Sequence, residues 1–123
     1  MQIAFVTIET NDMDASVAFY TETLDFELTT RQTPSPGVEL AFLKDLAGGQ
    51  IELIKRDTDP PVTPGVGSVS LTLYVDDIDA AYTRLLEKNT PGLEAPRTLP
   101  GGLKLFLAKD PNGVALGFIE ASH

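Results

Sequence analysis

Polar side chains that could take part in chemistry occupy alternate positions of two short segments about 65 residues apart. Thr7 and Glu9 alternate with apolar residues in the first segment, and Ser70, Thr72 and Tyr74 do so in the second. Hydroxyl, carboxylate and phenol groups can bind a polar ligand or exchange protons with it, and they need hydrogen-bond partners when buried. We expect this polar face to line a ligand cavity, the alternative being that it faces open solvent.

Other reactive groups are scarce. The chain has no cysteine, which excludes disulfides and thiol chemistry, and its single histidine, His123, is the last residue and is expected to fray rather than bind a metal. Acidic residues outnumber basic ones by 18 to 9, which argues against nucleic acid as a partner and leaves a cationic small molecule open. No apolar run approaches the roughly 18 residues of a membrane span. Without a visible signal peptide, we expect a cytoplasmic location.

The two polar segments belong to an internal repeat. Shifting the sequence by about 65 residues aligns its halves without a gap, and roughly 13 of about 58 aligned pairs are identical. Asp12 falls on Asp77 and Lys44-Asp45 falls on Lys109-Asp110. Two copies are too few for a solenoid, so the repeat predicts two similar modules that pack as a pseudo-symmetric pair around a cavity.

Hydrophobic periodicity predicts the same elements in each copy. Alternation over 2–10 and 68–75 indicates a strand, and each strand leads to a helix start at Asn11-Asp12 or Asp76-Asp77. Apolar residues at helical spacing follow, namely Met13, Val17, Tyr20 and Leu24 in the first copy and Ile78, Ala81, Tyr82, Leu85 and Leu86 in the second. Three short strands come next, at Glu27–Gln32, Val38–Leu43 and Gln50–Lys55, and at Leu93–Arg97, Leu103–Ala108 and Ala115–Glu120.

Each copy is therefore predicted to be β-α-β-β-β in an α+β fold. Module 1 spans 2–57, a proline-rich linker spans 58–66, and module 2 spans 67–122 of one domain covering 1–123. The prolines make the linker stiff and extended.

The paired pattern resembles the vicinal oxygen chelate superfamily, which includes glyoxalase I, extradiol dioxygenases and bleomycin-binding resistance proteins. The resemblance rests on Val17-Ala18-Phe19-Tyr20 followed by Leu24-Asp25-Phe26, on the segment from Val75 to Tyr82, and on Lys109-Asp110-Pro111-Asn112-Gly113. It implies a cup-shaped, incompletely closed eight-stranded barrel of two tandem βαβββ modules. It also implies a homodimer, since members of the superfamily commonly dimerise.

In metal-dependent members, the resemblance implies ligands at four positions, which fall here on Phe5, Glu52, Ser70 and Gly117. Only Glu52 keeps a good ligand, because phenylalanine has no donor atom, glycine has no side chain and serine is a poor ligand for a divalent transition metal. About three protein ligands are normally needed at a catalytic metal. We therefore predict that this chain has no metal site and no cofactor.

The first functional hypothesis is a metal-independent binding protein of the bleomycin-resistance type that sequesters a cationic or aromatic small molecule. Aromatic side chains would supply flat contacts, Glu9 and Glu52 would pair with a cation, and hydroxyls would complete the site. The predicted ligand-binding residues are Phe5, Thr7, Glu9, Phe42, Glu52, Ser70, Thr72, Tyr74 and Phe106. For the phenylalanines, the alternative is ordinary core packing.

Three other hypotheses stay open. A metal-free lyase or isomerase would use Glu52 as general base and Tyr74 as proton donor, because a carboxylate buried among apolar groups can have a raised pKa. A divalent-metal enzyme of the glyoxalase or dioxygenase type is a lesser alternative. A protein interaction module without a small-molecule role is the last.

Overall fold

The computed structural model describes residues 4–57 and 70–120. The chain divides into two compact units, Met1–Thr63 and Pro64–His123, called the first and the second unit below. The predicted linker 58–66 and His123 lie outside the described residues. No helix in the described part of the chain is long and apolar enough to cross a membrane.

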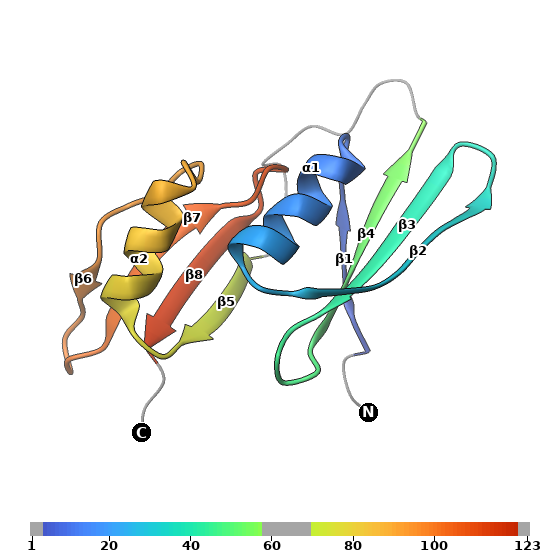
Figure 1. The fold of residues 1–123 in the computed structure, drawn as a ribbon. Helices are drawn as coiled ribbons and strands as arrows, with labels where there is room; N and C mark the ends of the chain where they lie inside the picture. Colours follow the sequence, from blue (N-terminus) through green and yellow to red (C-terminus); the bar gives the residue numbers. More distant parts are fainter. Residues whose placement is uncertain (1–3, 58–69, 121–123) are drawn as a thin grey trace. The chain divides into compact units, whose positions relative to one another are not determined.

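The first unit is a four-stranded sheet with one helical segment (Figure 1). Its elements are β1 (Val6–Glu9), α1 (Met13–Ala18), η1 (Phe19–Thr23), β2 (Glu27–Ser35), β3 (Val38–Lys44) and β4 (Gln50–Arg56). The strand order is β1-β4-β3-β2, with β1 parallel to β4 and the other neighbours antiparallel.

The second unit repeats this topology. Its elements are β5 (Ser70–Val75), α2 (Ile78–Glu87), β6 (Arg97–Thr98), β7 (Lys104–Lys109) and β8 (Ala115–Glu120), in the strand order β5-β8-β7-β6. Again the first strand is parallel to the last and the others are antiparallel. The prediction of two βαβββ modules is confirmed, and the offset of 65 residues holds strand by strand.

Each sheet buries one face under its own helix. In the first unit α1 packs on β3 and β4, and Ala41, Leu43 and Leu53 beneath it are fully buried. In the second unit α2 packs on β7 and β8 over Phe106, Ala108, Leu116 and Phe118. Because side chains alternate along a strand, each sheet also has a helix-distal face that points away from its own helix.

Aspartate caps start both helices, as predicted. The Asp12 carboxylate accepts a hydrogen bond from Ala15 N at 3.0 Å, and the Asp77 carboxylate accepts from Asp79 N and Ala80 N at 3.1 Å each. These bonds satisfy backbone donors that a first helical turn leaves without a partner.

The first helical segment departs from the regular spacing expected for it. After Ala18 it continues as one π-helical turn in which Leu24 N donates to Phe19 O at 3.2 Å, a separation of five residues. The wider turn buries Phe19 and Tyr20 together, whereas Val17 and Leu24 are only half-buried. The prediction that Val17 and Leu24 share one apolar helix face with Met13 and Tyr20 was therefore only partly right. In α2, Leu86 is likewise exposed, while Ile78 and Leu85 are buried.

The edge strands differ most from the sequence prediction. The strand β2 extends to Ser35, three residues beyond the predicted end, and all of it is exposed. The strand expected at Leu93–Arg97 is only the two-residue β6 at Arg97–Thr98, although Glu94 N still donates to Leu107 O at 2.9 Å. Pro96 has no N–H to donate, which explains why regular pairing begins after it.

Candidate functional site

The helix-distal face of the first sheet brings together four of the predicted site residues. Thr7 on β1 and Phe42 on β3 both lie beside Glu52 on β4 in the strand register. The Thr7 hydroxyl donates a hydrogen bond to Glu52 Oε1 at 3.0 Å. Phe5, just before β1, contacts Phe42. A carboxylate held by a hydroxyl therefore lies next to an aromatic pair.

The aromatic pair has an edge-to-face geometry. The Phe5 and Phe42 rings are 5.3 Å apart between centroids, with an interplanar angle of 87°. Phe5 is 43% exposed and Phe42 is half-buried, so the pair is not part of the fully buried core. Exposed aromatic faces attract cations through the ring quadrupole.

The two carboxylates predicted to pair with a cation have different partners on this face. Glu9 pairs with Arg56, whose Nη1 lies 3.3 Å from Glu9 Oε1, and both side chains are about half exposed. Among the described residues, Glu52 has no ion-pair partner, and its side chain bonds only the Thr7 hydroxyl. Glu9 and Glu52 were expected to act alike toward a cation, but the structure leaves only Glu52 with an uncompensated charge. The sequence pattern did not indicate Arg56, because its pairing with Glu9 depends on β1 lying beside β4.

The second unit places its predicted site residues on the equivalent face. Ser70, Thr72 and Tyr74 alternate along β5, and Tyr74 is 76% exposed. Gly117 lies beside Thr72 in the register, as Glu52 lies beside Thr7. A Cβ atom at Gly117 would lie 3.3 Å from Thr72 Oγ1. The position that carries a carboxylate in the first unit is therefore bare backbone in the second.

Phe106 does not belong with these residues. It is 1% exposed and stacks on Phe118, with ring centroids 4.5 Å apart and an angle of 11°, and its other aromatic neighbour is Tyr82 of α2. It lies on the helix side of its sheet, so its prediction as a ligand-binding residue is corrected to core packing. The repeat already held the signal, because the offset of 65 aligns Phe106 with buried Ala41 and Leu107 with Phe42.

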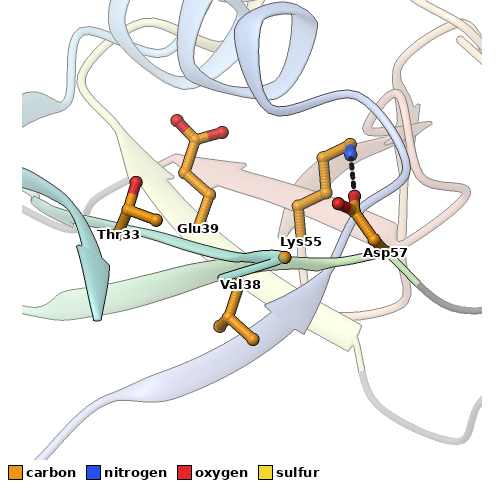
Figure 2. Close-up of a pocket in the computed structure, with 6 residues that line it drawn as sticks. Thr33, Val38, Glu39, Lys55 and Asp57 are labelled. Carbon is orange, nitrogen blue, oxygen red and sulfur yellow. Dashed lines mark hydrogen bonds and ion pairs between the residues drawn. The ribbon is translucent and has the colours of Figure 1, made fainter. Parts of the chain in front are cut away.

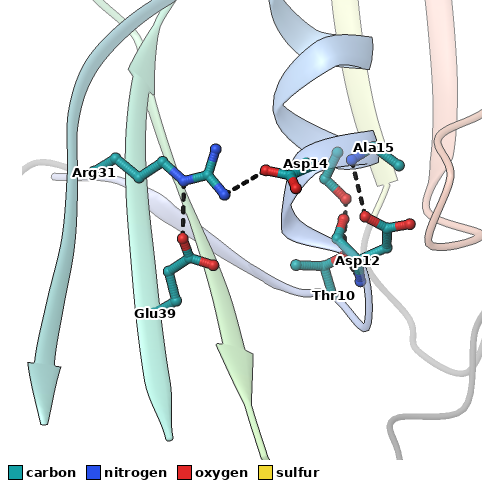
Figure 3. A network of polar contacts seen from close by, with 7 residues as sticks. Thr10, Asp12, Asp14, Ala15, Arg31 and Glu39 are labelled. Atoms are coloured by element: carbon teal, nitrogen blue, oxygen red, sulfur yellow. Dashed lines mark hydrogen bonds and ion pairs between the residues drawn. The ribbon is translucent and has the colours of Figure 1, made fainter. Parts of the chain in front are cut away.

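A polar network that the sequence pattern does not indicate holds the helix of the first unit on its sheet (Figure 3). Arg31 on β2 donates from Nε to Glu39 at 2.8 Å and from Nη2 to Asp14 of α1 at 2.6 Å. The hydrogen bond to Glu39, and then that to Asp14, raises the pKa of Arg31 above its ordinary value. The network ties an edge strand, its neighbour and the helix together.

A second polar cluster lies where α1 begins. The buried hydroxyls of Thr10 and Ser16 are 2.8 Å apart. Asp12 N donates to Thr10 Oγ1 at 3.0 Å, and Figure 3 shows these two residues where the helix begins. These bonds fix the path of the chain from β1 into the helix, so the strand that carries Thr7 is held at its end.

Comparison with known proteins agrees with this architecture. Residues 2–118 match the family model of the Glyoxalase/Bleomycin resistance protein/Dioxygenase superfamily. The chain belongs to this superfamily. The uncharacterized protein YwbC of Bacillus subtilis (strain 168) is 36% identical over an alignment of 118 residues, with 92% of each chain covered.

Solved structures of the superfamily share the fold. A glyoxalase family protein from Enterococcus faecalis matches with a TM-score of 0.79 and 26% identity, covering 97% of each chain. A superfamily member from Sphaerobacter thermophilus matches with a TM-score of 0.76 and 27% identity, covering 97% of this chain and 98% of the other. The predicted family and glyoxalase-type fold are thus confirmed.

The residues at the superfamily's metal-ligand positions do not fit a divalent metal here. Phe5 presents a ring, Gly117 presents no side chain, and Ser70 presents only a hydroxyl. Glu52 is the one carboxylate of the set, and a transition-metal site needs about three protein ligands. Among residues 4–57 and 70–120, no group of three or more His, Cys, Asp or Glu is placed to hold a metal ion.

Proposed function

We propose that this superfamily member binds a small cationic aromatic compound without a metal, and that Glu52 is the residue that pairs with the positive charge. The observation that carries the proposal is a carboxylate without an ion-pair partner beside an aromatic pair on one sheet face. Glu52 has a hydroxyl partner and no ion-pair partner among the described residues, and the Phe5–Phe42 pair adjoins it. Binding without turnover would make the protein a sequestering protein of the resistance type.

The chemistry of this face suits a flat cation. A cation over an aromatic face gains about 0.5–1 kcal/mol when exposed and about 2 kcal/mol when desolvated. A hydrogen bond to a charged group adds about 1.5–3 kcal/mol. The Thr7 hydroxyl holds one oxygen of Glu52, so less side-chain freedom is lost when a ligand binds.

The second unit carries the remaining predicted binding residues on its own sheet, and we propose them as ligand-binding by themselves. Ser70 and Thr72 supply hydroxyls, and the exposed Tyr74 supplies an aromatic face. We also propose that the protein acts as a homodimer, which sedimentation velocity would test by a dimer mass at micromolar concentration. A monomer at that concentration would contradict this part of the proposal.

The test is a fluorescence titration with two probes of nearly equal shape. N-methylacridinium carries a permanent positive charge, whereas acridine is uncharged at mildly alkaline pH. We expect the charged probe to bind at least about tenfold more tightly, because only it is attracted to the Glu52 carboxylate, and two opposite charges about 4 Å apart near a protein surface attract by about 4 kcal/mol. Equal affinities for the two probes would contradict the role of charge, and no binding of either would contradict an aromatic cation site.

Matched variants locate the site. Glu52→Gln keeps the shape of the side chain and removes its charge. It should therefore weaken the binding of the charged probe at least about tenfold and leave the affinity for acridine unchanged. Glu9→Gln is the control, because Arg56 already pairs with Glu9. If Glu9→Gln weakens binding as much as Glu52→Gln, the assignment of the cation to Glu52 is wrong.

A metal-free lyase or isomerase is the second candidate. The observation that favours it is the same Glu52, because Thr7 holds Oε1 while no described residue bonds Oε2. A general base needs such an accessible lone pair. Tyr74, the proposed proton donor, belongs to the second unit, and Glu52 belongs to the first. Any proton-transfer activity that survives Glu52→Gln would exclude this mechanism.

A further inference from the structure

A small cleft lies at the end of the first sheet, where the turn from β2 to β3 meets the end of β4. Its volume is about 230 Å³, and it is lined by Thr33, Gly37, Val38, Glu39, Lys55 and Asp57 (Figure 2). Glu39 and Lys55 alternate with Leu40 and Ile54, so they lie on the opposite face of the sheet from Glu52. The cleft is therefore separate from the cation site proposed above.

Two opposite charges face this cleft without bonding each other. Glu39 and Lys55 are direct neighbours in the register of β3 and β4. Their side chains nevertheless bond to other residues. Glu39 Oε2 accepts a hydrogen bond from Arg31, and Lys55 Nζ donates one to Asp57 Oδ1 at 3.1 Å. Figure 2 shows both side chains on the same side of the sheet, with the ammonium turned toward Asp57.

Each of these groups keeps hydrogen-bonding capacity. An ammonium has three donors, and Lys55 uses one of them on Asp57. A carboxylate has two acceptor oxygens, and the ion pair of Glu39 with Arg31 uses Oε2. The side chains of Glu39 and Lys55 are 31% and 33% exposed, so water screens them less than it screens a fully exposed pair.

We propose that this cleft binds a small zwitterion of the amino-acid class. Its carboxylate would accept from Lys55 Nζ and from the hydroxyl of Thr33, and its ammonium would donate to Glu39. A simple cation would meet a carboxylate already neutralised by Arg31, and a simple anion would meet an ammonium already neutralised by Asp57. A zwitterion matches both charges and leaves the net charge of the cleft unchanged.

The size of the cleft and the fixed turn beside it agree with a ligand of this kind. Its volume lies below the roughly 300–1,000 Å³ typical of sites for drug-sized molecules. Asp57 N donates to Gly37 O at 2.8 Å and joins the turn to β4. Gly37 has φ +77, and a Cβ there would touch the Asp57 side chain at 3.5 Å, so glycine both permits the turn and keeps this wall free of a side chain.

The test is an NMR titration of ¹⁵N-labelled protein with zwitterions of increasing length and with their separate charged halves. The zwitterions are glycine, β-alanine and γ-aminobutyrate, and the halves are methylamine and acetate. We expect at least one zwitterion to shift the amide signals of Gly37, Lys55 and Asp57 saturably. Its Kd should be at least about tenfold lower than that of methylamine or acetate, because it makes a second charge-assisted contact.

Variants on the two faces of the sheet complete the test. Lys55→Gln and Glu39→Gln should each raise the Kd of the best zwitterion at least about tenfold, while Glu52→Gln should leave it unchanged. Well-dispersed spectra of each variant verify that it is folded. The proposal is overturned if no probe shifts these amides, if a single-charge probe binds as tightly as the best zwitterion, or if both cleft variants bind it normally.

Discussion

The two units share the side chains that direct the backbone and differ in those that cover the sheet faces. Asp12 and Asp77 cap the two helices, and Asp45 and Asp110 each accept backbone N–H groups in the turn before the last strand. Thr7 and Thr72 hold the same register position, yet one neighbours Glu52 and the other neighbours Gly117. The scaffold thus needs the same local hydrogen bonds twice, whereas the chemistry of each face is its own.

The units also fasten their helices in different ways. The first unit uses the hydroxyls of Thr10 and Ser16 and the guanidinium of Arg31. The offset of 65 aligns these positions with Val75, Ala81 and Pro96, which are apolar. In the second unit Ile78 N instead donates to the Glu120 carboxylate at 3.3 Å. Different side-chain hydrogen bonds therefore hold the helix in place in the same topology.

The largest effect is expected from comparing Phe106→Ala with Phe42→Ala. Phe106 is fully packed under α2, so its truncation should lower the free energy of unfolding by about 3–5 kcal/mol. Phe42 is half-buried on the helix-distal face, so Phe42→Ala should lower the free energy of unfolding clearly less than Phe106→Ala does. Urea unfolding followed by circular dichroism measures both. Equal losses would mean that Phe42 is a core residue and would remove it from the proposed ligand site.

The next largest effect is expected from comparing Asp110→Ala with Asp45→Ala, which alter the equivalent turns before β8 and β4. Asp110 is 1% exposed and accepts from Asn112 N at 2.7 Å and Val114 N at 2.8 Å, so Asp110→Ala should cost about 2–3 kcal/mol. Asp45 accepts from Ala47 N and Gly49 N but is more exposed, so Asp45→Ala should cost about 1 kcal/mol. Asp110→Asn is the control, because it keeps an acceptor oxygen and should recover much of the loss. If Asp110→Asn is as destabilising as alanine, charge rather than hydrogen bonding stabilises the turn.

These comparisons also show what the sequence could predict. Strand alternation has a period of two, so it correctly placed Thr7, Thr72 and Tyr74 on faces away from the helices. The helix caps followed from local side-chain chemistry, and the βαβββ order of elements followed from hydrophobic periodicity and the repeat. The same pattern leaves the partner of each polar group open, because Glu9 finds Arg56 only once β1 and β4 lie side by side.

The failures have physical reasons as well. The π-helical turn buries Phe19 beside Tyr20. A regular helix of about 3.6 residues per turn does not predict which side chains are buried after the wider turn. Phe106 was predicted to bind a ligand together with Phe42 because both are aromatic, although the repeat aligns Phe106 with Ala41. The Arg31 network joins residues 17 positions apart and depends on how α1 crosses the sheet. Contacts that depend on tertiary packing are therefore the features of the site that could not be predicted from this sequence.

The smallest effect comes from a pair of matched substitutions in the two helices. Asp14 and Asp79 occupy equivalent positions in the first helical turn, where a negative charge is favourable. Only Asp14 also pairs with Arg31, with side-chain exposures of 86% and 36%. Asp14→Asn should therefore destabilise the protein by about 0.2–1 kcal/mol more than Asp79→Asn at low salt, which is the range of exposed ion pairs.

Salt and pH then separate the ion pair from the helix effect. At about 1 M salt the screening length falls to about 3 Å, so the difference between Asp14→Asn and Asp79→Asn should shrink toward zero. Glu39 and Asp14 raise the pKa of Arg31, so its stabilising charge is fully present below its ordinary pKa and is lost only above the raised value. The low-salt difference should therefore persist from neutral to mildly alkaline pH. A difference that survives high salt would mean that Asp14 acts through packing or capping, and the two helices would then be fastened more alike than their sequences indicate.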